Sequence, residues 1–210
     1  MITLFCALVA YLIGSLSFAI LSSRMFGLPD PRTYGSGNPG ATNVLRSGRK
    51  AAALVTLIGD CGKGVVAVLV ARHLAFRFGA GDHAVSGAAV AVFLGHLYPL
   101  YFRFKGGKGV ATALGVLLGL SPWLAALATA MFGIVVGVSR YVSLASVVAA
   151  ISSAIAAPLL LGWGTSAGAV IVVAALVVWR HRGNLRRLIA GTERRLGFNR
   201  PDSPAPGGPS

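Results

Sequence analysis

Residues 1–23 read MITLFCALVAYLIGSLSFAILSS and contain no charged side chain. A membrane-spanning helix needs about 20 consecutive apolar residues, because it rises about 1.5 Å per residue through about 30 Å of hydrocarbon. No Lys or Arg precedes this run, although a secretory signal peptide would begin with positive charge. We therefore expect residues 1–23 to be a retained membrane span.

Apolar runs recur along the whole chain of 210 residues, which is 55% hydrophobic and only 11% charged. A soluble domain carries about 25% charged residues. The runs cover residues 1–23, 51–71, 84–102, 109–120, 123–139, 142–161 and 166–179. The sequence predicts an all-α, polytopic integral membrane protein with seven transmembrane helices. A single transmembrane domain is expected over 1–198, followed by a disordered cytoplasmic tail over 199–210, which is rich in Pro, Gly and Ser.

The net charge of +14 is explained by topology, because cytoplasmic loops collect Lys and Arg. With a periplasmic N-terminus and a cytoplasmic C-terminus, 16 of the 19 basic residues fall on the cytoplasmic side. They are Arg24, Arg32, Arg46, Arg49, Lys50, Arg103, Lys105, Lys108, Arg140 and the seven arginines from Arg180 to Arg200. We therefore expect no nucleic-acid partner.

Residues 109–139 allow two readings, one long tilted helix or two helices divided at Ser121-Pro122-Trp123. A single crossing would turn the arginine-rich tail outward, so the division is favoured. The first helix would then be too short for the bilayer, at about 18 Å. We expect the preceding segment, Gly106-Gly107-Lys108-Gly109, to dip below the lipid surface into a wet, protein-walled cavity.

The first polar cluster is GSGNPGATNVLR, residues 35–46. It fits the dinucleotide pattern G-x-G-x-x-G, but that pattern needs a preceding strand, and here an apolar helix precedes it. A bare Gly-Pro turn with Arg46 reaching lipid headgroups is the structural alternative. We favour an anion site, in which glycine backbone N–H groups and a guanidinium converge. Its candidate residues are Gly35, Ser36, Gly37, Asn38, Gly40, Thr42, Asn43 and Arg46.

The second cluster is GHLYPLYFRFKGGKGVAT, residues 95–112. It is not a Walker P-loop, because Gly109 replaces the required Ser or Thr. Free N–H groups of Gly106 and Gly107, the positive end of a helix and the ammonium of Lys108 are expected to converge on a phosphate. Lys105 is a further candidate. The alternative is that both lysines merely follow the positive-inside rule.

The third cluster is HRGNLRRLIAGTE, residues 181–193. In a helix, His181, Asn184 and Leu188 share one face. A basic amphipathic tail on anionic lipid explains the arginines, but it explains neither His181 nor Asn184, so these two are assigned to the site. Ser143 belongs to a further polar patch and is also a candidate.

Within the predicted spans, Asp60 and Lys63 lie three residues apart, and we expect a structural ion pair. Cys6 and Cys61 are interpreted as small buried hydrophobic residues. No cluster with metal-ligand spacing is apparent. We expect neither metal nor cofactor, and chelators should leave activity intact.

The three clusters, in this order, resemble the signature blocks of the bacterial acyl-phosphate:glycerol-3-phosphate acyltransferases. The resemblance covers nearly the whole chain. It implies a seven-helix protein of the bacterial inner membrane with a cytoplasmic active site. The implied reaction moves an acyl group from acyl phosphate to glycerol 3-phosphate, giving lysophosphatidic acid. The resemblance also implies functional roles for Ser36, Arg46, the Gly/Lys segment, His181 and Asn184, and cooperation with the peripheral enzyme that makes acyl phosphate.

The residues suit this chemistry, because both substrates carry phosphate and an acyl phosphate is already activated. Alignment and charge neutralisation then matter more than a strong base. Either His181 or the donor's own phosphate oxygen accepts the proton, and the sequence leaves both open. A covalent acyl-Ser36 intermediate is disfavoured, because no His–acid pair surrounds it. The alternative functions are a transporter of an organic phosphate and a lipid-binding scaffold.

Overall fold

The computed structural model describes residues 1–197, so the predicted tail over 199–210 lies outside the described residues. All the regular secondary structure within residues 1–197 is helical. Its elements are α1 (Ile2–Gly14), α2 (Phe18–Met25), α3 (Ala41–Leu45), α4 (Lys50–Arg77), α5 (Asp82–Leu97), the 3-10 helix η1 (Leu100–Phe102), α6 (Val110–Leu120), α7 (Pro122–Ser139), α8 (Val142–Leu161), α9 (Thr165–Arg180) and α10 (Arg182–Ile189).

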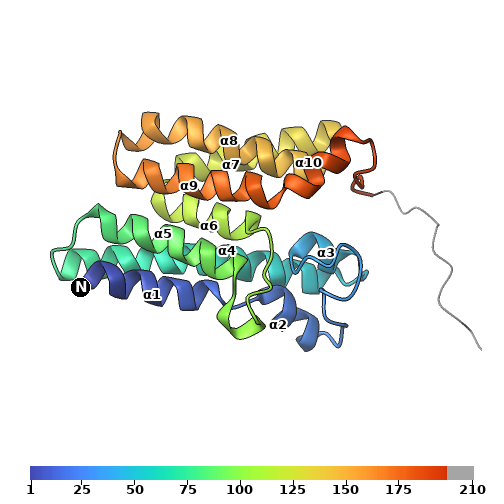
Figure 1. Cartoon of the computed structure of the whole chain (residues 1–210), viewed down its shortest axis with the longest axis horizontal. Helices are drawn as coiled ribbons and strands as arrows, with labels where there is room; N and C mark the ends of the chain where they lie inside the picture. The colour runs from blue at the N-terminus through green and yellow to red at the C-terminus, as the bar shows by residue number, and fades with distance from the viewer. Residues whose placement is uncertain (198–210) are drawn as a thin grey trace, which may run out of the picture.

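The long helices form two groups with α6 between them (Figure 1). One group contains α1, α4 and α5, and its core is dominated by small side chains such as Ala67, Ala71 and Ala88. The other contains α7, α8 and α9, which share a second apolar core with α6. Helix α6 packs against α4 on one side and against α7 on the other. Its first residue therefore lies in the middle of the molecule.

Close backbone contact fixes α6 against α4. A Cβ added to Gly115 of α6 would overlap the carbonyl oxygen of Cys61 in α4. A Cβ added to Gly64 of α4 would overlap the carbonyl oxygen of Thr112 in α6. In a membrane, where the hydrophobic effect cannot press helices together, such small residues let backbones gain van der Waals contact.

Each of the seven predicted apolar segments is helical over most of its length. Five helical stretches are long and apolar enough to cross a membrane, namely Ile2–Met25, Lys50–Arg77, Asp82–Phe102, Pro122–Ser139 and Val142–Leu161. A sixth arises if α9 and α10, bent by 53°, are taken together, while α6 is a shorter apolar helix. The structure thus supports a multi-pass helical membrane protein.

The predicted division of residues 109–139 is confirmed. Helix α6 ends at Leu120 and α7 begins at Pro122. Proline favours the first position of a helix, where its missing N–H costs nothing. The Ser121 hydroxyl caps α7 by accepting a hydrogen bond from the Leu124 N–H at 3.5 Å. The single long helix is thereby excluded.

The first predicted span is not one continuous helix, because α1 ends at Gly14 and α2 begins only at Phe18. At this break the carbonyl oxygen of Leu16 accepts a hydrogen bond from Lys63 Nζ at 2.6 Å. The second span is longer than expected, since α4 continues to Arg77. Cys6 is buried as predicted, whereas Cys61 is partly exposed.

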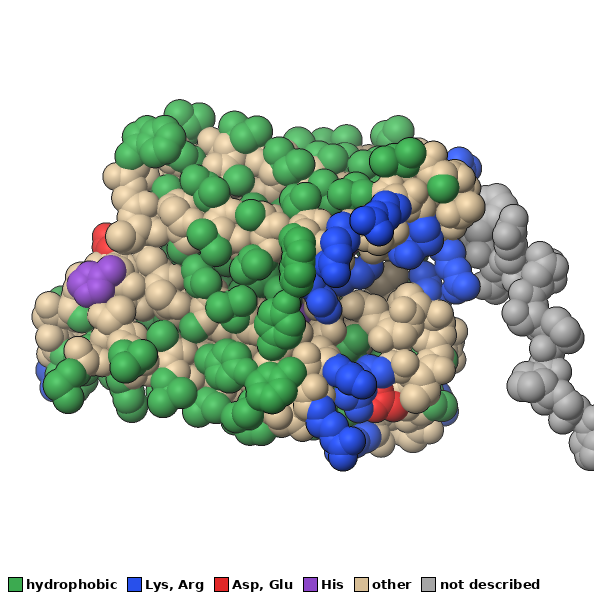
Figure 2. Space-filling view, viewed as in Figure 1, with side chains coloured by type: hydrophobic (Ala, Val, Ile, Leu, Met, Phe, Trp, Pro, Cys, Tyr) green, Lys and Arg blue, Asp and Glu red, His purple; other side chains and the backbone are tan. Residues whose placement is uncertain are grey.

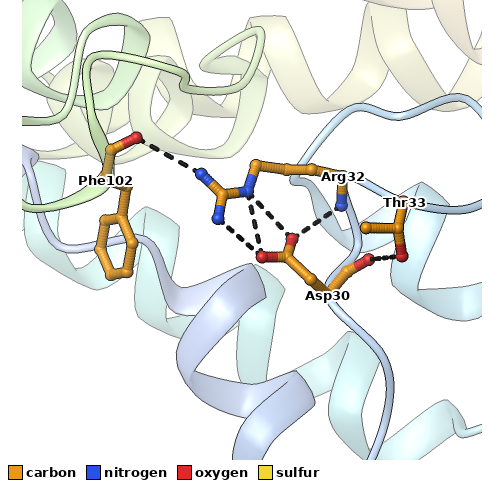
Figure 3. A network of polar contacts seen from close by, with 4 residues as sticks. All are labelled: Asp30, Arg32, Thr33 and Phe102. Carbon is orange, nitrogen blue, oxygen red and sulfur yellow. Dashed lines mark hydrogen bonds and ion pairs between the residues drawn. The ribbon is translucent and has the colours of Figure 1, made fainter.

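The three polar clusters lie at one end of the bundle, where α2, α3, α10 and the loop before α6 gather (Figure 1). Lys and Arg side chains surround a hollow at this end, while hydrophobic side chains are spread over the remaining face (Figure 2). Arg32 joins two of the loops there, as Figure 3 shows. It pairs with Asp30 at 2.6 Å and donates to the carbonyl oxygen of Phe102 at 3.3 Å.

Candidate functional site

A cavity of about 1820 Å³ opens between the three clusters, and each cluster contributes to its wall. Its polar part is lined by Ser36, Asn38, Thr42, Arg46, Lys108, Ser143, His181, Asn184, Arg187 and Glu193. Its apolar part lies between the helices and is lined by residues such as Leu117, Phe132 and Val170. The cavity therefore combines a cationic region with an apolar interior.

The turn of the first cluster is held from inside by Asn43, which is 2% exposed. Its Oδ1 accepts the Ser36 N–H at 2.9 Å, and its Nδ2 donates to the carbonyl oxygens of Pro31 and Tyr34 at 2.7 and 3.2 Å. The Asn43 amide therefore holds the turn, although Asn43 also lines the cavity, and its predicted role in substrate binding stays a prediction. Gly37 likewise donates its N–H to Tyr34 and does not line the cavity.

Four side chains of the same cluster do face the cavity, namely Ser36, Asn38, Thr42 and Arg46. Within residues 1–197, none of them hydrogen-bonds to another protein group. Gly35 and Gly40 line the cavity through their backbone, with Gly35 at a φ of +61° beside the Asn43 amide. The anion-binding potential of this cluster therefore rests mainly on side chains.

The Gly-rich segment of the second cluster differs from expectation. Gly106 and Gly107 donate their N–H groups to the carbonyl oxygens of Leu97 and His96, at 3.2 and 3.3 Å. Their own carbonyl oxygens accept hydrogen bonds of 3.0 to 3.2 Å from Arg180. The prediction of free N–H groups at Gly106 and Gly107 is wrong, and these glycines shape the loop that carries Lys108.

Lys105 and Lys108 occupy different surroundings. Lys105 is exposed and does not line the cavity, whereas Lys108 does. Gly109, which follows Lys108 and caps α6, has a φ of +79°. A Cβ at Gly109 would overlap the ring of Phe93. The required glycine sets the direction in which the chain enters α6, and so places Lys108 at the cavity wall.

His181 lies between α9 and α10 and is 2% exposed. Its Nδ1 lies 2.8 Å from the carbonyl oxygen of Val177, one turn earlier in α9. A carbonyl oxygen only accepts hydrogen bonds, so Nδ1 carries a proton. In the neutral imidazole, Nε2 is then the acceptor, as a general base requires.

Lys108, Asn184 and Glu193 form a chain of hydrogen bonds. Lys108 Nζ donates to Asn184 Oδ1, and Asn184 Nδ2 donates to Glu193 Oε1. Ser143 donates to the same carboxylate oxygen at 2.8 Å, and Arg187 donates to its second oxygen at 2.8 Å. The predicted candidates Lys108, Asn184 and Ser143 are thus linked through one carboxylate.

The charges of this network shift the pKa values of its members. Burial lowers the pKa of Lys108 to about 8, assisted by the nearby Arg187, Arg180 and Arg46, while Glu193 opposes the shift. Burial would raise the pKa of Glu193, but hydrogen bonds from Asn184, Ser143 and Arg187 outweigh it and lower that pKa. At neutral pH the site therefore holds a carboxylate among several cations.

Comparison with known proteins agrees with this arrangement. Residues 4–191 match the family model described as glycerol-3-phosphate acyltransferase. The chain belongs to the glycerol-3-phosphate acyltransferase family. A relative of that name from Thiobacillus denitrificans is 54% identical over 197 residues, which cover 94% of this chain and 98% of the relative. Another, from Paraburkholderia xenovorans, is 55% identical over 92% of this chain and 91% of the relative.

Two solved structures resemble the acyltransferase fold described above. Both are crystal structures of PlsY, an integral membrane glycerol 3-phosphate acyltransferase. Its glycerol 3-phosphate form has a TM-score of 0.86 and 39% sequence identity, covering 93% of this chain and 96% of that chain. Its lysophosphatidic acid form has a TM-score of 0.83 and 38% identity, covering 93% and 95%.

Three residues of this acyltransferase escaped the sequence analysis as site residues. Glu193 belongs to the third cluster, but its spacing in the sequence does not indicate that its carboxylate accepts hydrogen bonds from Ser143, Asn184 and Arg187. Arg180 was counted only as a topological charge, yet it holds the loop of Lys108. His96 lines the cavity beside the predicted Asp60–Lys63 ion pair, which is confirmed at 2.7 Å. In residues 1–197, no three His, Cys, Asp or Glu side chains gather as metal ligands.

Proposed function

We propose that this acyltransferase moves a fatty acyl group from acyl phosphate to the primary hydroxyl of glycerol 3-phosphate, yielding lysophosphatidic acid and phosphate. The family membership supports the acceptor and the product. The observation that carries the proposal is the cavity, whose cationic part joins an apolar interior between α6, α7, α8 and α9. Such a cavity suits two phosphates and one hydrocarbon chain.

The phosphates are assigned to two groups of side chains. The first cluster receives the headgroup of acyl phosphate, with Ser36 donating a hydrogen bond to it. Arg46 and Lys108 bind and neutralise the phosphate of glycerol 3-phosphate. Arginine presents a planar pair of donors to phosphate, whereas lysine acts as a point charge. Lys105 is left out of this assignment, because it is exposed outside the cavity.

The chemical step is a displacement at the acyl carbon. The hydroxyl oxygen of the acceptor forms a bond to this carbon, and the bond from the carbon to the phosphate oxygen breaks. The hydroxyl proton passes to His181 Nε2 and then to the departing phosphate, or it passes to a phosphate oxygen directly. Because Val177 holds Nδ1 of His181, the imidazole keeps one orientation during this transfer. Asn184 orients the acceptor beside it.

We further propose seven membrane crossings, with a periplasmic N-terminus and a cytoplasmic C-terminus, in the inner membrane of a bacterium. Helix α6, with 11 residues, is the shortest of the proposed crossings, and residues 106–109, just before it, are partly buried. The clustering of basic side chains at the cavity end supports a cytoplasmic active site. A peripheral enzyme that makes acyl phosphate would deliver the donor there.

The proposal is tested with purified protein in lipid vesicles, given acyl phosphate, acyl-CoA or acyl carrier protein side by side. We expect lysophosphatidic acid and phosphate from acyl phosphate alone. Vesicles without the protein serve as the inactive control. Accumulation of labelled glycerol 3-phosphate inside the vesicles, without lysolipid, would instead establish a transporter. A protein that only binds lipid would do neither.

A further inference from the structure

His96, in the last turn of α5, is 6% exposed and lines the cavity, yet no step above uses it. Its Nδ1 lies 2.9 Å from Lys63 Nζ of α4 and 3.2 Å from the Thr112 hydroxyl of α6. A buried imidazole between three helices has its ring orientation fixed by these contacts. The remaining question is which ring nitrogen carries the proton.

The contact with Lys63 decides this, because its ammonium group can donate three hydrogen bonds and can accept no hydrogen bond. Its Nζ makes three polar contacts, with the carbonyl oxygen of Leu16 at 2.6 Å, with Asp60 Oδ1 at 2.7 Å and with His96 Nδ1 at 2.9 Å. Asp60 favours the charged form of Lys63, since an unpaired buried charge is costly. Nδ1 of His96 is therefore an acceptor, and the neutral ring carries its proton on Nε2.

The Nε2 donor of His96 has no hydrogen-bond partner within residues 1–197. It is also not sealed inside the protein, because Nε2 is not among the fully enclosed side-chain atoms of residues 1–197 that lack a hydrogen bond. A Cβ added to Gly107 would lie 2.5 Å from Nε2 and 2.8 Å from the carbonyl oxygen of Pro39. Nε2 therefore lies where the first and second clusters meet.

We propose that His96 is a further substrate-binding residue, whose Nε2–H donates a hydrogen bond to a phosphate oxygen in the cavity. Asp60 and Lys63 act as positioning residues, because they fix the tautomer that makes Nε2 a donor. This inference rests on the proposed function, in which both substrates carry a phosphate. A neutral donor complements Arg46 and Lys108, since it binds the anion without adding another buried charge.

The test is His96→Asn, because the shorter amide can still accept from Lys63 but cannot reach the position of Nε2. His83→Asn is the matched control, since His83 lies in the first turn of the same helix and is exposed. We expect the KM of one phosphate substrate, and the inhibition constant of inorganic phosphate, to rise about ten-fold in His96→Asn. The substrate whose KM changes identifies the phosphate bound. Unchanged KM and inhibition constants in a protein that melts like the wild type overturn the proposal.

A second measurement separates this inference from the proposed function and does not need His96→Asn to fold. The wild-type protein has four histidines, so replacing the exposed His73 and His83 by Asn leaves ¹⁵N signals from His96 and His181 only. The signal that persists when His181 is also replaced by Asn is assigned to His96, and phosphate is added to the protein that retains His181. We expect a proton on Nε2 whose resonance shifts when inorganic phosphate is added. A proton on Nδ1, or a resonance that phosphate leaves unmoved, contradicts the proposal. Absence of acyl transfer by the wild type would contradict the proposed function alone.

Discussion

Lys108, just before α6, donates a hydrogen bond to the side-chain oxygen of Asn184 in α10. The two residues come from different signature clusters and meet at the cavity wall. An Asn184→Asp substitution would place a carboxylate against this ammonium. The resulting ion pair would compete with substrate phosphate for Lys108, so we expect the KM for glycerol 3-phosphate to rise at least about ten-fold. Steady-state kinetics at fixed acyl phosphate measures it, and an unchanged KM would separate Lys108 from phosphate binding.

Lys108 also predicts a pH dependence. Because burial lowers its pKa to about 8, the ammonium is present below that pH and is lost as the pH rises through it. The second pKa of a phosphate monoester is about 6, so the substrate charge stays constant in this range. We expect kcat/KM to fall above pH 8. In Lys108→Arg, whose guanidinium stays protonated throughout this pH range, the fall should disappear even if overall activity is lower. A profile identical in both proteins would assign the titration to another group.

Arg180 predicts an effect on activity through loop position. Its guanidinium donates hydrogen bonds to the carbonyl oxygens of Gly106 and Gly107. Arg182, in contrast, donates to the carbonyl oxygen of Trp179, three residues earlier, and lies over the Trp179 ring at 4.5 Å. Lysine cannot reproduce the planar set of donors. We expect Arg180→Lys to lower kcat/KM by about ten-fold or more and to speed amide hydrogen exchange across residues 103–109. Arg182→Lys is the matched control, and equal effects of the two substitutions would refute the role of Arg180.

Arg46 predicts a difference between two arginines three positions apart. Both side chains are exposed, but Arg46 lines the cavity and Arg49 does not. Replacing Arg46 by Lys keeps the charge but removes bidentate phosphate binding. We expect the loss of one charge-assisted hydrogen bond to lower kcat/KM about ten- to hundred-fold, and Arg49→Lys to remain within about two-fold of the wild type. Near-normal turnover of Arg46→Lys would remove this residue from the proposed site.

The sequence predicted the helices well where hydropathy and proline act locally. The division before Pro122 is such a case, because proline at the first position of a helix marks its start. The break within residues 1–23 was missed. The polar group that meets the exposed Leu16 carbonyl is Lys63, 47 residues away, and hydropathy carries no information about such a partner.

The candidate site was predicted only in part, for a related reason. Residue type showed that Lys108, His181 and Asn184 belong together, and the cavity brings them together. Residue type did not show whether a polar group faces the cavity or the protein. Asn43 and Ser36 are both polar residues of one turn, yet the amide of Asn43 closes the turn while the hydroxyl of Ser36 stays open. Only the folded backbone decides between these outcomes.

Arg180 and His181 are consecutive residues at the end of α9. Arg180 holds the loop that carries Lys108, and His181 presents its imidazole to the cavity. A displacement of the end of α9 would move both residues together. It would therefore shift the loop that carries Lys108 and the imidazole of His181 at the same time. Lys108 and His181 would then lose their positions in the cavity in the same movement, and neither would keep its place while the other lost it.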